Sequence, residues 1–203
     1  SMLRAASTRT GSGGTHSLFG AESVLNPFWE SFKLVKRTLV GDHHLNLHSI
    51  KAAPATPEGY AARFPTAKDQ KILEELAGEQ AVEEWGVDPR RSAKVAHEAS
   101  CRELIDKRLA LIGTQGAKNV FFCARHSPVS DAMMLERLHV PVAFRRPRVL
   151  AGVLAHAAAL CFEGAKPEME LLCFVDRSRE PWMQACKEVG FETVSYYRLI
   201  KLR

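Results

Sequence analysis

The run RVLAGVLAHAAALCFEGAKP, residues 148–167, restricts the fold more than any other part of the sequence. It predicts a helix that is apolar on nearly every side. Such a helix cannot keep one face in water, so other elements must cover it. The chain has 203 residues, 46% of them hydrophobic, which is enough for one globular domain with a core of this kind.

The segments around this helix predict an α/β domain over residues 66–203. Thr66 and Asp69 form a variant of the capping box, and Asp88 followed by Pro89 begins a second helix that we expect to end at Gly113. Helices and buried strands then alternate, which is typical of an α/β or α+β fold. The expected helices are 66–85, 88–113, 149–163 and 179–191, and the expected strands are 118–125, 131–144, 169–176 and 192–202.

Residues 1–65 have a different character, and we expect them to form a long extended N-terminal arm. The chain begins with arginine, serine and glycine and has no acidic residue before Glu22, as in mitochondrial transit peptides or what remains after their cleavage. An ordinary flexible tail has the same composition. The aromatic residues Phe28, Trp29 and Phe32 are the predicted partner-binding residues, since an arm of this kind can wrap a neighbouring subunit. A mitochondrial matrix location is the expectation.

The stretch LHVPVAFRRPRVLAG, residues 138–152, places a strand before three arginines and a helix. Anions gather where a strand leads into a helix N-terminus. Phosphate loops at such places normally use glycine, because its backbone can approach the ligand. Here Arg146, Arg148 and Leu150 stand at the spaced positions, and Pro147 lacks an N–H donor.

Residues 138–194 resemble the C-terminal half of the GNAT acyltransferase superfamily. The matching positions are Leu138, Val140, Phe144, Arg145 and Val149, followed by an N-E-P-like helix start at 179–181 and a GF pair at 190–191. The resemblance implies a GNAT-like mixed sheet flanked by helices. It also implies that coenzyme A would bind along the strand containing Val140, with its pyrophosphate at the loop of Arg145, Arg146 and Arg148.

The departures from the family pattern lie where that cofactor would bind. The spaced glycines are absent, Cys186 replaces the tyrosine that often acts as general acid, and Arg179 replaces the asparagine of the helix start. The sequence therefore predicts a non-catalytic accessory subunit of a large mitochondrial assembly (respiratory chain, ATP synthase or ribosome) without a cofactor. The alternative is an active N-acyltransferase that uses acetyl-CoA or another acyl-CoA, with Cys186 as its proton donor. The arginine loop could instead face a protein partner or RNA.

Other candidate groups carry weaker signals. His43, His44 and His48 could place two imidazoles on one helical face, but nearby prolines favour irregular backbone, and we predict no metal site. Glu83 and Glu84 could be a carboxylate pair or simply a charged helix end. The five cysteines are expected to be reduced core residues. No apolar run approaches the roughly 20 residues that span a bilayer. The net charge of +5 does not select a partner.

Overall fold

Eight strands form one mixed sheet in the order β1-β8-β2-β7-β6-β5-β4-β3. They are seen in a computed structural model that describes residues 16–32, 38–126 and 130–202. Only β6 and β7 pair in parallel among these strands. The strands are β1 (His16–Ala21), β2 (Leu39–Ile50), β3 (Tyr60–Arg63), β4 (Ala110–Gln115), β5 (Lys118–Arg125), β6 (Ala132–His139), β7 (Glu170–Asp176) and β8 (Glu192–Leu202). The α-helices are α1 (Glu22–Phe32), α2 (Gln70–Trp85), α3 (Pro89–Ser92), α4 (Lys94–Asp106), α5 (Pro147–Phe162) and α6 (Glu180–Val189).

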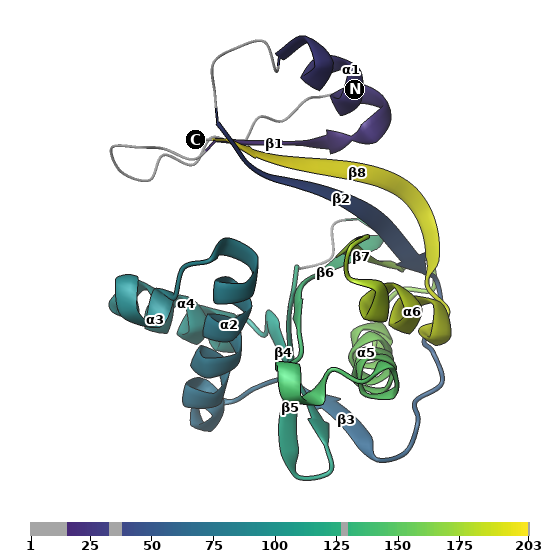
Figure 1. Ribbon diagram of the computed structural model, residues 1–203. Helices are drawn as coiled ribbons and strands as arrows, with labels where there is room; N and C mark the ends of the chain where they lie inside the picture. The colour runs from purple at the N-terminus through teal and green to yellow at the C-terminus, as the bar shows by residue number, and fades with distance from the viewer. Residues whose placement is uncertain (1–15, 33–37, 127–129, 203) are drawn as a thin grey trace.

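Helices cover both faces of the sheet (Figure 1). The helices α2, α3 and α4 lie on one face, and α5 and α6 lie on the other. The side chains of Leu150, Val153 and Leu154 in α5 are fully buried against the sheet, as the apolar sequence of this helix predicts. The expected mixed sheet flanked by helices is therefore confirmed. No helix in the described ranges has the length and apolar character that crossing a membrane requires.

The second expected helix is shorter than the sequence indicated. Helix α4 ends at Asp106, and the segment expected to complete it becomes β4. Arg108 has a φ of +53°, a left-handed conformation that ends a helix. The run from Ala110 to Ile112 is fully buried in the sheet. A short continuous apolar run does not distinguish a buried strand from a buried helix, so the prediction of helix to Gly113 was wrong.

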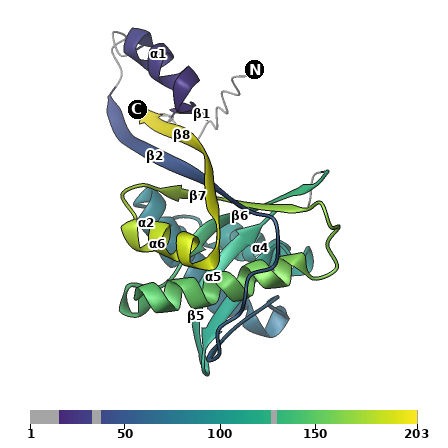
Figure 2. The same cartoon turned by 90° about the vertical axis from the view of Figure 1, so that its right-hand side faces the viewer.

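The N-terminal segment also differs from the expected extended arm. Strand β2 is an interior strand, because it pairs with β7 from Leu45 to Ile50 and with β8 from Leu39 to Ser49. Figure 2 shows the outer halves of β2 and β8 projecting from the body, with β1 and α1 at their far end. The described part of residues 1–65 is thus built into the sheet. The residues that suggested a transit peptide lie outside the described chain.

Helix α1 packs against the outer end of the sheet. Its Leu25 is fully buried with Ile200 and Leu202 of β8, and Trp29 packs on the same cluster. Phe28 remains 39% exposed. The side chain of Phe32 is outside the described set. Of the three predicted partner-binding residues, Trp29 therefore contributes to the packing of this chain, and Phe28 is partly exposed.

Because β2 completes the sheet, removal of residues 1–50 should destabilise the whole fold. Both β7 and β8 would lose a strand partner and its buried side chains. We expect a loss of several kcal/mol, or a melting temperature lower by about 10 °C or more. Thermal unfolding followed by circular dichroism measures this. Removal of residues 1–15 is the control, and an equal melting temperature in both truncated chains would contradict the assignment of β2 to the sheet.

Candidate functional site

Strands β6 and β7 separate partway along their length. Their parallel pairing runs from Ala132 with Glu170 to Leu135 with Cys173. Strand β6 also carries an irregularity in its pairing with β5, and Arg137 at this point has a φ of +56°. Backbone groups beyond the last pair must find other partners, since unpaired buried carbonyls are costly. This opening between the strands is the candidate functional site, referred to below as the cleft.

Two arginines satisfy the carbonyls of β6 at the cleft. Arg179, just before α6, donates from Nη2 to the carbonyl oxygen of Leu138 at 3.3 Å. Arg145, just before α5, donates from Nε to the carbonyl oxygen of Val140 at 2.6 Å. The two side chains come from the two elements that follow β6 and β7. They donate to carbonyls of the stretch along which the GNAT resemblance places a cofactor.

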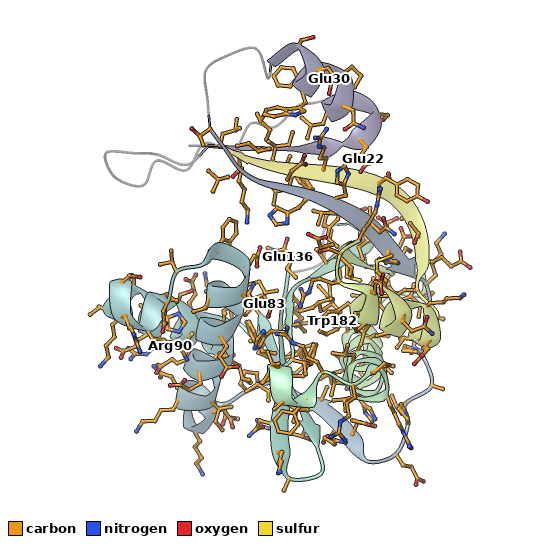
Figure 3. The ribbon with its side chains drawn as sticks, in the orientation of Figure 1. Glu22, Glu30, Glu83, Arg90, Glu136 and Trp182 are labelled. Carbon is orange, nitrogen blue, oxygen red and sulfur yellow. The ribbon has the colours of Figure 1, made fainter. Side chains whose placement is uncertain are left out.

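Glu83 on α2 holds both guanidinium groups. Its carboxylate accepts a hydrogen bond from Arg145, and its Oε1 lies 3.4 Å from Nη2 of Arg179. Figure 3 shows Glu83 between α2 and the central strands. His139, at the end of β6, places Nδ1 3.2 Å from Glu83 and Nε2 3.2 Å from Glu79. These five residues, Glu79, Glu83, His139, Arg145 and Arg179, are called the Glu83 cluster below.

The electrostatics of the Glu83 cluster strongly favour the ionised carboxylate. The hydrogen bond from His139 lowers the pKa of Glu83, burial opposes this, and the charges of Arg179 and Arg145 lower it further, to about 2. Burial lowers the pKa of Arg179, although the charge of Glu83 counteracts that effect. The carboxylate of Glu83 therefore stays ionised at neutral pH and joins α2 to the arginines that precede α5 and α6.

The loop before α5 uses most of its own backbone donors. The N–H groups of Arg145, Arg146, Val149 and Leu150 all donate to carbonyls between residues 142 and 146. Pro147 has no N–H to offer. Few amides therefore remain to bind a diphosphate at this helix N-terminus.

The predicted residues of this loop differ in burial and in their contacts. Val140 is buried and Arg145 joins the Glu83 cluster, whereas Arg146 and Arg148 are exposed. Leu150 is fully buried in the core and does not fill the loop. Bulk at positions 146, 148 and 150 is thus not what occupies the cleft.

A cavity of about 510 Å³ lies on the α2 side of the cleft, beneath the overhanging β2 and β8. Asp176 at the end of β7 and His43 of β2 line it, with Nδ1 of His43 2.8 Å from Oδ2 of Asp176. Burial raises the pKa of Asp176, but hydrogen bonds from Ser178 and His43 outweigh burial and leave that pKa below its usual value. A histidine held by a carboxylate in this way can accept or donate a proton.

The three histidines of the predicted cluster lie on a strand and have separate partners. Nδ1 of His44 is 2.6 Å from Glu22, and the buried His48 has Nδ1 3.4 Å from Oγ1 of Thr193. Over the described residues, no group of three or more potential metal ligands is present. The rise of about 3.3 Å per residue along a strand keeps His44 and His48 apart, whereas a helix would have brought them together.

Cys186 is fully buried between α6 and the sheet, with Sγ 4.0 Å from Sγ of Cys173. It does not line the cavity beside His43. The five cysteines are all buried free thiols, as expected from the sequence. Burial raises the pKa of Cys123 well above its usual value, which keeps that thiol protonated. Cys186 is thus placed as a packing residue.

Sequence signals for the residues that the structure brings together are weak. Glu83 was considered only as half of a pair with Glu84, although Glu79 and Glu83 share one helical face four residues apart. His139 and Asp176 had not been singled out. Asp176 ends an expected strand, and a polar residue at the end of a buried strand is the signal that could have identified it. His139 lay within the expected strand 131–144, which was too long, because β6 ends at His139.

Comparison with known proteins identifies the fold. No family model matches the chain, and no curated protein matches it. A GCN5-related N-acetyltransferase from Sphaerobacter thermophilus superposes with a TM-score of 0.62 at 18% identity, over 93% of this chain and 59% of that one. A GNAT-family acetyltransferase from Colwellia psychrerythraea gives 0.59 at 11% identity, over 92% and 64%. A tandem GNAT protein from the clavulanic acid biosynthesis pathway gives 0.59 at 11%, over 92% and 63%.

The chain therefore has the GNAT fold, as the motifs in residues 138–194 predicted. It spans about three fifths of the length of these solved structures. The structural likeness at this level of identity concerns the arrangement of the elements. What the protein does has to be argued from its own side chains.

The depressed pKa of Glu83 makes the fold sensitive to acid. Its ionised form contributes stability that is fully present above the ordinary pKa of 4.5 and is lost as the pH falls toward 2. We expect Glu83→Gln to cost about 1–3 kcal/mol at pH 7, because it leaves charged donors without their acceptor. The variant should also show a weaker fall in stability between pH 4.5 and 2.

Urea unfolding at several pH values measures both effects. Glu168→Gln is the control, because Glu168 is exposed and has no ion pair within the described chain. If wild type and Glu83→Gln lost stability in parallel as the pH fell, the Glu83 cluster would not have the role described.

Proposed function

We propose that this GNAT-fold protein does not transfer acyl groups and serves as an accessory subunit of a larger assembly. The observation that carries the proposal is that Arg145 and Arg179 occupy the carbonyls of Val140 and Leu138. Both arginines are fixed by Glu83. A cofactor chain that paired with this strand would have to displace two charge-assisted interactions, which are stronger than neutral hydrogen bonds.

The setting that we propose is the mitochondrial matrix, in a respiratory-chain or ATP synthase complex or, as a further option, a ribosome. The composition of the first residues of the chain supports the compartment. The exposed Phe28 on α1 supports contact with a protein subunit, since aromatic residues are enriched at interfaces. Arg146 and Arg148 are exposed and could instead meet phosphates of RNA.

The second candidate function is acyl-CoA-dependent N-acyl transfer. The His43–Asp176 pair supports it, because the pair lines the cavity beside the cleft. In that reaction the acceptor amine attacks the thioester carbonyl, the amide bond forms, and coenzyme A leaves as the thiol. His43 would take the proton that the amine loses and give it to the departing thiolate. Arg145 and Arg179 would first have to leave the strand.

Thermal unfolding with acetyl-CoA separates the two functions. We expect no change in melting temperature at millimolar acetyl-CoA, because the cleft hydrogen bonds are already made within the chain. Binding at 100 times Kd would contribute about 2.7 kcal/mol, which is a clear shift. ADP is the control ligand, because it carries the diphosphate without the thioester arm. A saturable rise with acetyl-CoA that ADP does not produce would reject the non-catalytic function and support the transferase.

The accessory role makes a separate prediction for Phe28. The substitution Phe28→Asp places a charge on the exposed side of α1 and should reduce co-sedimentation of the protein with its native assembly. The melting temperature of the purified variant should stay within about 1–2 °C of wild type, as for most surface changes. Val95→Asp is the matched control, because Val95 is 80% exposed on α4. Unchanged co-sedimentation of Phe28→Asp would show that this face of α1 does not dock.

A further inference from the structure

Two cations that line the cavity have no carboxylate partner among the described residues. Lys201 of β8 is only 7% exposed, and its ammonium donates to the carbonyl oxygen of Glu84 at 3.1 Å and lies 3.9 Å from the ring centroid of Trp85. Arg137 of β6 donates from Nε to the side-chain oxygen of Gln80 at 3.0 Å and lies 5.1 Å from the ring of Phe122. Among the residues that the structure describes, neither has a carboxylate oxygen within 4.0 Å.

Neutral partners compensate these charges only partly. An ammonium has three N–H donors and a guanidinium has five, and each group here uses one of them in a hydrogen bond between described residues. Burial lowers the pKa of Lys201 and that of Arg137, with only weak opposing effects from nearby acids. Desolvated charges without counter-ions are costly, and they concentrate at binding sites.

The acids that line the same cavity already have partners. Asp176 faces His43 at 2.8 Å, and Glu136 faces His126 at 2.8 Å. Glu83 is held by the Glu83 cluster. Figure 3 shows Glu136 between the central strands and the overhanging β2 and β8. Glu84 also lines the cavity and accepts a hydrogen bond from Gln80. The acids of the lining thus have partners among the described residues, whereas Lys201 and Arg137 keep N–H donors that no such hydrogen bond uses, which favours an anion over an amine.

Apolar side chains form the remaining wall. Phe19 of β1 and Phe174 of β7 meet edge to face at 5.4 Å between ring centroids, and Leu199 lies beside them. Leu135 and Leu138 of β6 line the opposite side. A volume of about 510 Å³ lies within the usual range of small-molecule sites, roughly 300–1,000 Å³.

We propose that this cavity binds a small amphipathic carboxylate. The carboxylate lies between Lys201 and Arg137, and the apolar body packs against Phe19, Phe174 and Leu199. A single negative charge fits better than a phosphate dianion, because Glu83, Glu84, Glu136 and Asp176 also line the cavity. The proposal involves no reaction and does not depend on the proposed function.

Octanoate is a suitable probe, used with the full chain below the concentration at which octanoate self-associates. We expect a saturable rise in melting temperature with octanoate, whereas octylamine and octan-1-ol, which have the same chain with a positive or neutral head, should give none. Lys201→Met keeps a side chain of similar length without the charge and should weaken octanoate binding at least tenfold by calorimetry. Lys68→Met, at an exposed lysine in the 3-10 helix Ala67–Asp69 that precedes α2, is the control and should bind as wild type.

The melting temperature of each variant without ligand shows whether it folds, and a second variant serves if the first does not. Lys201→Met should melt no lower than wild type, because it removes a buried charge that lacks a counter-ion. Arg137→Met is the second variant and should also bind octanoate at least tenfold more weakly. The proposal is overturned by unchanged octanoate affinity in both variants, by an equal response to octan-1-ol, or by no response in wild type. A response to acetyl-CoA that Lys201→Met leaves intact would count against the proposed function and not against this site.

Discussion

Beyond Leu135 and Cys173, strand β6 no longer pairs with β7, and the chemistry of the cleft follows from how its free carbonyls are satisfied. Guanidinium groups suit this task because each has several N–H donors in one plane. Arg145 reaches the carbonyl of Val140 with Nε and Glu83 with Nη2, and Nη2 of Arg179 lies near both the carbonyl of Leu138 and Glu83. A single carboxylate can therefore hold both arginines. Where β6 and β7 separate, Glu83 and the two arginines therefore connect α2 to β6 and to the segments that precede α5 and α6.

The position of Glu83 depends in turn on how α2 is fixed at its start. Asp69 precedes α2 and accepts two hydrogen bonds from Arg63 of β3, each at 2.7 Å, and others from the N–H and hydroxyl of Thr66. The paired Arg63 holds the pKa of Asp69 far below its usual value. This anchor ties α2 to the edge strand of the sheet. Glu79 and Glu83 then meet His139 from the other end of the helix.

Sequence reasoning succeeded where local patterns determine local structure. The all-apolar α5, the strand and helix of residues 169–191, and the capping pair Thr66 and Asp69 were predicted from periodicity and from capping residues. It failed for β4, where a short buried run continued a helical pattern. It also failed to place β2, because the pairing of β2 with β7 joins residues more than a hundred positions apart. The Glu83 cluster has the same origin, since it collects side chains from α2, β6 and the starts of two later helices.

The sequence places bulky side chains at 146, 148 and 150, where phosphate loops use glycine, but in the structure none of them occupies the cleft. Arg146 and Arg148 are exposed, and Leu150 is buried in the core. A cofactor with a diphosphate and an amide-bearing arm needs donors in the loop and acceptors on the strand. Most N–H groups of the loop donate hydrogen bonds to carbonyls of the same loop. The carbonyls of Leu138 and Val140 accept hydrogen bonds from Arg179 and Arg145. The loop hydrogen bonds use donors only, and the arginine hydrogen bonds use acceptors only. Together they use both the donors and the acceptors within the chain.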